Sequence, residues 1–149
     1  MNKTITLRRL GPENLAVLLG VEEGLFDNAI RPDQAEAFLN DPLHEMVLAF
    51  EGDTVVGMAS GQVLLHPDKP PAFFVNEVGV RDDYLRQGIA TELCKDLMQI
   101  ARARGCEGIW LATEADNVPA RALYTAMAAR ETEDIVVYDW DDRAMDGSG

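Results

Sequence analysis

The sequence predicts an α/β protein of the mixed α+β kind, in which about four helices flank a central mixed β-sheet of six to seven strands. Its 149 residues are 47% hydrophobic and 26% charged, which suits one ordinary globular domain. Strand-like runs alternate with segments of helical periodicity in the order β-α-α-β-β-β-α-β-α-β. Helices interleaved with strands in this way pack on the faces of a sheet. We therefore expect a single domain over residues 1–142, followed by a disordered polar tail, 143–149.

Turn-forming residues mark most of the expected element boundaries. Gly52 and Asp53 separate two apolar runs and predict a hairpin turn. Pro32 is typical of the first turn of a helix, and Gly105 of a position just past a helix end. The expected strands are 4–10, the two arms of the hairpin within 45–65, 72–80, 108–113 and 133–140, and the expected helices are 12–25, 31–42, 89–104 and 117–127.

The net charge of −13 limits the classes of partner. We expect no nucleic-acid partner, because phosphate binding needs a basic face. An acidic protein attracts cations over a Debye length of roughly 8 Å at physiological salt. The excess of acidic residues therefore serves solubility, or it attracts a polycationic ligand, and composition does not choose between the two.

The sequence carries no membrane or metal signal. No apolar run approaches the roughly 20 residues of a membrane span, and the first ten residues lack a signal-peptide core. Cys94 and Cys106 supply neither a disulfide framework nor a four-ligand metal site. We expect a cytoplasmic protein that binds neither membrane nor metal.

A glycine marks the start of the helix after strand 72–80. The unpaired N–H groups of a helix N-terminus attract anions. Gly88 has no Cβ and Ala90 only a methyl group, so an anion can approach the backbone from Arg86 to Thr91. The stretch is neither a Walker A loop nor a dinucleotide fingerprint. Taken alone, it favours close packing of strand and helix over an anion-binding turn.

A second motif, "NVPARALY", opens the helix 117–127. Asn117 is a plausible N-cap, and Asn117, Ala120 and Tyr124 lie nearly in line along the helix. Tyr124 falls at the edge of the apolar face, where its hydroxyl can reach a cleft. The alternative is a core tyrosine whose hydroxyl is satisfied internally.

Taken together, "RQGIA" and "NxxAxxLY" resemble the motifs of the GNAT superfamily of acetyl-CoA-dependent N-acyltransferases. The resemblance runs from the first strand to Trp140 and is most specific from Val78 to Tyr124. It implies that the turn binds the coenzyme A pyrophosphate, that the preceding strand pairs with pantetheine, and that Tyr124 protonates the departing thiolate. The cofactor-binding residues it implies are Val78, Gly79, Val80, Arg86, Gln87, Gly88, Ile89, Ala90, Thr91, Asn117, Ala120 and Tyr124.

The sequence departs from the superfamily pattern at two places. Leu85 stands where Gln or Arg is usual, at a contact made largely through backbone. Ala128 and Ala129 stand where a glycine and then an aromatic or aliphatic residue are usual. A left-handed Ala128 would cost of order 1 kcal/mol.

Glu77 is the predicted general base. Strand alternation places Phe73, Val75, Glu77 and Gly79 on one face, where burial would raise the pKa of the carboxyl. An amine must be neutral to attack a thioester, so the reaction needs a proton acceptor. The alternative is a structural carboxylate paired with an arginine. The position matches an acidic catalytic residue of several GNAT enzymes, which favours the base.

Further acidic residues predict a cationic acceptor. Asp139 and Asp141 lie two apart in the last expected strand, Glu114 and Asp116 follow strand 108–113, and Asp27 joins the first two expected helices. The stretches "LFDNAI", "NEVGVRDDYLRQGIATEL" and "VVYDWD" are similar to the short aminoglycoside 3-N-acetyltransferases. The expected acceptor-binding residues are Asp27, Glu77, Glu114, Asp116, Asp139 and Asp141.

The resemblance implies acetyl transfer from acetyl-CoA to an amine of an aminoglycoside antibiotic, with no metal, and hence antibiotic resistance. Another polyamine or a protein amine is the alternative acceptor. A non-catalytic coenzyme A-binding module is the alternative of a different class. The pattern also suggests a homodimer that completes the site or covers the edge of the last strand.

Overall fold

A computed structural model describes residues 4–140 of the chain. These residues form two compact units, one ending at Ala112 and the other beginning at Thr113. The first unit contains the sheet, and we describe the two units separately. The predicted single domain over 1–142 stays a prediction, and the predicted tail, 143–149, lies outside the described residues.

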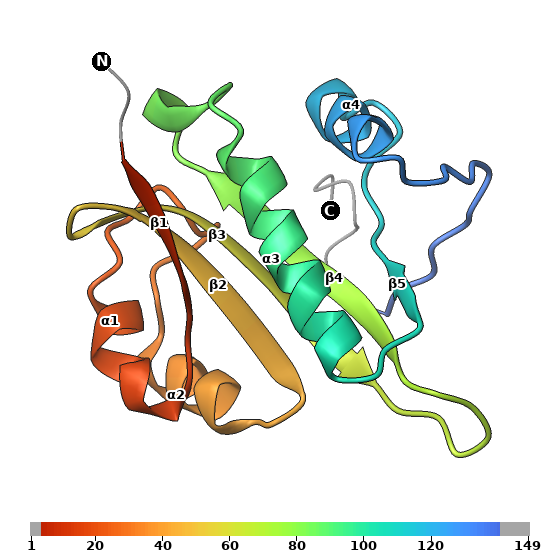
Figure 1. Ribbon diagram of the computed structural model, residues 1–149, viewed down its shortest axis with the longest axis horizontal. Helices are drawn as coiled ribbons and strands as arrows, with labels where there is room; N and C mark the ends of the chain where they lie inside the picture. Colours follow the sequence, from red (N-terminus) through yellow and green to blue (C-terminus); the bar gives the residue numbers. More distant parts are fainter. Residues whose placement is uncertain (1–3, 141–149) are drawn as a thin grey trace. The chain divides into compact units, whose positions relative to one another are not determined.

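The first unit is built on a mixed sheet in the order β1-β2-β3-β4-β5 (Figure 1). Neighbouring strands from β1 to β4 are antiparallel, and β5 is parallel to β4. This confirms the predicted mixed α+β class, although the described residues form five strands rather than six to seven. The strands are β1 (Ile5–Arg9), β2 (His44–Glu51), β3 (Thr54–Leu64), β4 (Ala72–Val80) and β5 (Gly108–Trp110).

Two apolar cores cover the two faces of this sheet. Helix α3 (Ile89–Ala103) buries Leu93 and Leu97 against one face, which includes the fully buried Phe73. Helices α1 (Leu15–Leu19) and α2 (Pro32–Asn40) pack against the other face. Fully burying one such side chain contributes about 1.5–3 kcal/mol, so the two cores fix these helices on the sheet.

The predicted helix 12–25 is wrong over its second half. A short 3-10 turn (Pro12–Asn14) leads into α1, which ends at Gly20. Residues 20–31 form a loop, in which Gly24 has a φ of +103°. Leu25 is buried in the second core as a loop residue, so its apolar character reflects burial and does not continue the helical period.

The second unit contains helix α4 (Val118–Ala126). The predicted N-cap is confirmed, because the Asn117 side chain accepts a hydrogen bond of 3.2 Å from the Ala120 N–H. The predicted strand 133–140 is wrong, since residues 130–140 form neither helix nor strand. A strand needs a partner for its backbone groups, and no other strand is described in this unit.

Ala128 ends α4 in the left-handed region, with a φ of +66°. The Ala129 N–H bonds back to the Tyr124 carbonyl at 3.0 Å, which is the helix-ending geometry that favours glycine. We expect Ala128→Gly to stabilise the protein by about 1 kcal/mol, because glycine has no Cβ to strain. Urea denaturation would measure the gain. A neutral or destabilising result would contradict the assigned strain.

Candidate active site

Among residues 4–140, no strand pairs with the edge of β4 away from β3 over most of its length. β5 pairs only with Ala72 to Phe74, whereas β3 pairs with β4 as far as Val80. The backbone from Val75 to Val80 therefore offers hydrogen-bonding groups to an extended ligand on that edge. An extended chain that adds itself to a sheet edge is a common mode of recognition. Val78, Gly79 and Val80, the predicted pantetheine contacts, all lie in this segment.

A β-bulge sits in the middle of β4. Ser60 pairs with Glu77 but Gly61 pairs with Val75, so Asn76 is an extra residue in the strand. Phe73 and Val75 face the α3 core, as do Val78 and Val80 after the bulge. A Cβ on Gly79 would instead lie 3.7 Å from the Met58 side chain, in the other core.

The bulge corrects the predicted orientation of the candidate base. Phe73, Val75, Glu77 and Gly79 do not share one face, because the extra residue moves Glu77 and Gly79 to the face that carries α1 and α2. Bulges often re-aim a side chain next to an active site. Glu77 thus points towards loop 20–31 and not into the core beneath α3.

The predicted direction of the Glu77 pKa is confirmed. The side chain reaches solvent, and partial burial of the carboxyl group raises its pKa, with a further contribution from the negative charge of Asp27. Asp27 is itself exposed. Two neighbouring carboxylates repel each other, so a proton or a cationic ligand between them is favoured. The structure therefore brings together two of the predicted acceptor-binding residues, one on the strand and one on the loop.

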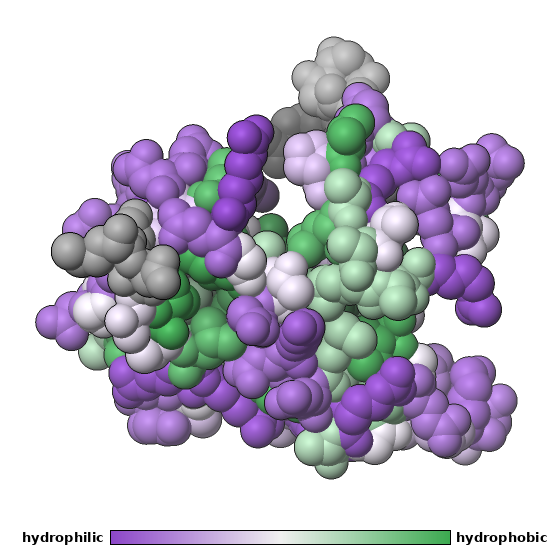
Figure 2. All heavy atoms as spheres, turned by 45° about the horizontal axis from the view of Figure 1, so that its top comes forward, coloured by the Kyte–Doolittle hydropathy of each residue, from purple (hydrophilic) through white to green (hydrophobic). Residues whose placement is uncertain are grey.

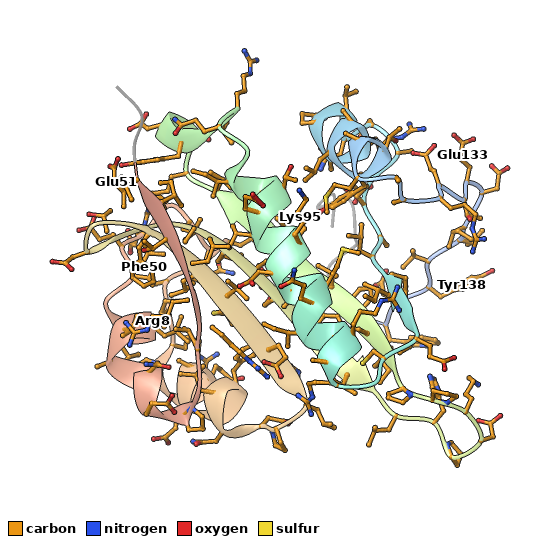
Figure 3. All side chains as sticks on the ribbon, viewed as in Figure 1. Arg8, Phe50, Glu51, Lys95, Glu133 and Tyr138 are labelled. Carbon is orange, nitrogen blue, oxygen red and sulfur yellow. The ribbon has the colours of Figure 1, made fainter. Side chains whose placement is uncertain are left out.

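The turn from β4 to α3 is anchored at Tyr84. Its hydroxyl donates a hydrogen bond to the carboxylate of Glu51, the last residue of β2. Glu51 is labelled in Figure 3. Beyond this anchor, Leu85, Arg86, Gln87 and Gly88 are all exposed. Arg86 has a left-handed φ of +63°, which is unusual outside glycine. A fixed turn with an exposed tip suits a ligand that approaches the backbone.

Gly88 is the N-cap of α3 and has a φ of +79°. A Cβ added at Gly88 would meet nothing within 4 Å, so the glycine opens the turn to solvent and does not serve close packing. No side chain caps α3, which leaves the first N–H groups, from Ile89 to Thr91, directed at this opening. The glycine thus meets the steric and electrostatic needs of a pyrophosphate site.

Gly88→Ala is expected to weaken coenzyme A binding roughly tenfold, because the methyl group enters the opening in front of the helix N–H groups. Gly105→Ala is the matched control, since Gly105 has a similar φ of +82° and equally open surroundings. Both variants should lose about 1 kcal/mol of stability through backbone strain. Calorimetric titration with coenzyme A separates them, and equal loss of affinity in both would exclude the turn as the site.

The remaining predicted site residues belong to the second unit or lie beyond it. Tyr124 and Ala120 are half-buried on α4, and the Asn117 amide donates to the Thr113 hydroxyl at 3.2 Å. Both polar ends of Asn117 therefore have protein partners. Glu114, Asp116 and Asp139 are exposed, whereas Asp141 lies outside the described residues. Without the predicted strand, the alternation argument for pairing Asp139 with Asp141 no longer applies.

Two features of the site were not expected from the sequence. The bulge at Asn76 arises from the pairing of β3 with β4, and only Gly79 hinted at an irregularity there. Arg81, directly after β4, contacts the loop that carries Asp27, and no sequence signal distinguished it from a solvated arginine. One feature lies directly before Glu77 in β4, and the other links the end of β4 to the loop that carries Asp27.

The structure also shows the hydropathy of one face, the placement of potential metal ligands and the lengths of the helices. Figure 2 shows hydrophilic residues over the outer parts of the drawn face, with hydrophobic patches between them. Within residues 4–140, no group of histidine, cysteine and acidic side chains is placed to hold a metal ion. Over the same residues, no helix is long and apolar enough to span a bilayer.

The sequence pattern of the Acetyltransferase (GNAT) family matches residues 18–128. The chain belongs to the GNAT acetyltransferase family. Members of this family use acetyl-CoA as the acyl donor. No curated protein matches the sequence.

Solved structures share the fold at low identity. An aminoglycoside acetyltransferase from an uncultured soil metagenomic sample, in complex with trehalose, superimposes with a TM-score of 0.82 at 17% identity, over 92% of this chain and 95% of the other. AAC(6')-Iy, an aminoglycoside N-acetyltransferase in complex with CoA, gives 0.76 at 18% identity, over 94% and 97%. A ribosomal-protein-alanine N-acetyltransferase from Brucella melitensis gives 0.71 at 20% identity, over 93% and 100%. At these identities the likeness establishes the GNAT fold alone.

Proposed function

We propose that this GNAT protein transfers acetyl from acetyl-CoA to an amino group of an aminoglycoside antibiotic, and so confers resistance. One observation carries the proposal. In a single unit, β4 carries Glu77 and an edge that no described strand covers beyond Phe74, the exposed Gly88 turn follows that strand, and Asp27 is near enough to influence Glu77. The 3-N position rests on the sequence resemblance alone. The solved relatives include an AAC(6') enzyme and do not favour that position.

Acetyl-CoA fits this unit as the acyl donor. The amides from Arg86 to Thr91 would hold its pyrophosphate, at the opening that the missing Cβ of Gly88 provides. The free edge of β4 at Val78 to Val80 would pair with the pantetheine arm. A protein of net charge −13 repels an anionic donor, so Arg86 and the helix N-terminus supply the local positive potential. Asn117 and Ala120 are further contacts that the resemblance implies.

Glu77 acts as the base, directly or through a water molecule. It removes a proton from the ammonium group, and the neutral nitrogen attacks the thioester carbon. A carbon–nitrogen bond forms, the nitrogen releases its second proton to solvent, the carbon–sulfur bond breaks, and the electron pair leaves with sulfur as a thiolate. A backbone N–H near Val78 or Gly79 stabilises the oxyanion that develops in between. The raised pKa of Glu77 suits this role, because it brings the base closer to neutral pH.

Tyr124 is assigned as the acid that protonates the thiolate. Tyr124→Phe is expected to lower kcat about tenfold and to leave the affinity for coenzyme A nearly unchanged. The effect is modest because a thiol has an ordinary pKa near 8.5 and leaves readily as the anion. Steady-state kinetics with thiol detection would measure it. An unchanged kcat would remove Tyr124 from the mechanism.

The acceptor is expected to be polycationic because the proposed site in the first unit carries two neighbouring carboxylates. Asp27 and Glu77 would bind ammonium groups, and partly desolvated ion pairs of this kind raise both affinity and association rate. One solved relative is in complex with sisomicin, an aminoglycoside, at 20% identity and a TM-score of 0.73. Glu114, Asp116, Asp139 and Asp141 complete the set of proposed acceptor contacts.

A protein amine is the second candidate acceptor, and the fold shared with a ribosomal-protein-alanine N-acetyltransferase favours including it. Purified protein would be assayed with acetyl-CoA against aminoglycosides, spermidine and an alanine-initiated peptide. Turnover of aminoglycosides alone supports the proposal. Preference for spermidine or the peptide would replace the antibiotic, and no turnover with any amine would leave a coenzyme A-binding module.

A further inference from the structure

Arg81 connects the sheet to loop 20–31 through its guanidinium group. Nε donates to the Val55 carbonyl of β3 at 2.8 Å. Nη2 and Nη1 donate to the carbonyls of Glu22 and Glu23 at 2.8 and 2.9 Å. The backbone N–H of Arg81 donates to the Val56 carbonyl at 2.9 Å, which fixes the start of the side chain. One side chain thus bonds two segments that lie more than 20 residues apart in the sequence.

Loop 20–31 lies directly on the end of β4. A Cβ on Gly79 would lie 3.6 Å from the Leu25 carbonyl, and a Cβ on Gly24 would lie 3.3 Å from Arg81 Nη1. Leu25 is buried in the second core. The loop contains no helix or strand. Its position is set by the hydrogen bonds from Arg81 and by apolar contacts with the second core, which are made by Val21, Leu25, Phe26 and Ile30. Asp27 follows Leu25 and comes near enough to influence the Glu77 carboxyl.

We propose that Arg81 is a positioning residue that holds loop 20–31, and with it Asp27, over β4, so that affinity for the amine depends on a residue that does not touch it. This inference rests on the proposed function. The Arg81 guanidinium donates to backbone carbonyl groups and not to the carboxylates of Glu22 and Glu23. A lysine carries the same charge but cannot place planar donors on separated carbonyls.

The test compares Arg81→Met and Arg81→Lys with Arg8→Met. Arg8 is an exposed arginine of β1 on the same side of the sheet as α1, and it has no role in the proposed site (Figure 3). Amide hydrogen exchange of residues 20–31 is the first readout. We expect exchange to accelerate about tenfold or more in Arg81→Met, to be intermediate in Arg81→Lys and to stay unchanged in Arg8→Met. Unchanged exchange in Arg81→Met would overturn the proposal.

Steady-state kinetics are the second readout. A general disturbance of the structure would raise the KM values for both substrates, whereas a displaced loop 20–31 should raise only the KM for the amine. We expect the KM for the amine to rise about tenfold in Arg81→Met, while kcat and the KM for acetyl-CoA stay within about twofold. Equal increases in both KM values, or an unchanged KM for the amine, would overturn the proposal. A wild-type protein that acetylates no amine would overturn the proposed function and the amine part of this inference, while hydrogen exchange still decides whether Arg81 holds the loop.

Discussion

Replacing the base, Glu77→Gln, is expected to lower kcat/KM for acetyl transfer by about a hundredfold to ten-thousandfold. The amide is close in size to the carboxylate and keeps a hydrogen-bonding oxygen, but it cannot accept the ammonium proton. Glu107→Gln, at an exposed glutamate just before β5, controls for the loss of one negative charge from the same unit. Thiol-release kinetics would measure both variants. Activity within about threefold of the wild type in Glu77→Gln would exclude Glu77 as the base.

The pH dependence gives an independent check on the same residue. The base must be deprotonated, so kcat/KM falls as the pH drops through the pKa of Glu77. Partial burial, and to a smaller extent the charge of Asp27, raise that pKa. The fall of kcat/KM on the acid side of the pH profile (the acid limb) should therefore occur at a higher pH than the ordinary pKa of glutamate. Asp27→Asn removes a negative charge and should move the limb to lower pH. In Glu77→Gln the limb should disappear from the residual activity.

The same shift has a consequence for stability. A carboxyl whose pKa is raised on folding binds its proton more tightly in the folded state, so stability falls as the pH rises from the unfolded to the folded pKa. Above that window, Glu77 as a carboxylate destabilises the fold. Glu77→Gln should therefore be at least as stable as the wild type at neutral pH. If Glu77→Gln loses activity but no stability, the loss comes from the chemistry and not from unfolding. Catalytic residues commonly make the fold less stable than it could be.

The sequence allowed most of the sheet to be predicted, because its signals are local. The hairpin around Gly52 and the end of α3 at Gly105 follow from residues that adopt a positive φ. The helical period of α3 follows from Ile89, Leu93 and Leu97, which all face one core. Gly88 taken alone favoured close packing of strand and helix, which the open space around it contradicts, and only the resemblance to the GNAT motifs predicted an anion-binding turn.

Other parts of the site depend on contacts between distant segments and could not be predicted. The bulge at Asn76 exists only in the pairing of β4 with β3. Residues 20–25 were predicted as helix because Leu25 is apolar, but it is buried in the second core as part of a loop. Arg81 acquires its role only when Glu22 and Glu23 are brought to it by folding.

The last predicted strand, 133–140, is an error of another kind, because the sequence predicts an element that these residues do not form. Residues 135–138 are apolar and β-branched or aromatic, which is typical of a strand. In the structure Ile135 and Val136 are about 70% exposed, and Tyr138 is also exposed (Figure 3). A high β-propensity means that a side chain suits a pleated, half-buried surface. It does not provide a neighbouring strand whose backbone groups can pair with the segment. A predicted homodimer that covers this segment stays a prediction.

The largest effect on stability is expected at Glu45, which lies in β2 with only 6% of its side chain exposed. Arg9 of β1 donates to it through Nε at 3.0 Å and Nη2 at 2.8 Å, and Arg104 at the end of α3 donates at 2.7 Å. Glu45→Met is expected to cost about 3 kcal/mol, since it leaves two guanidinium groups without their carboxylate. The cost stays at the lower end of the usual range because Arg9 and Arg104 still reach water, with 53% and 27% of their side chains exposed.

Thermal denaturation would measure this as a fall in Tm of about 6–12 °C for a chain of this size. Asp33→Asn, which breaks the exposed pair with Arg31, should cause no measurable change and serves as the control. The triple variant Arg9→Met, Glu45→Met, Arg104→Met separates two causes. If unpaired buried charge dominates, removing all three charged groups should recover most of the lost stability, because well-packed apolar replacements of buried ion pairs are often neutral. A triple variant less stable than Glu45→Met would show instead that the hydrogen bonds joining β1, β2 and α3 hold this end of the sheet together.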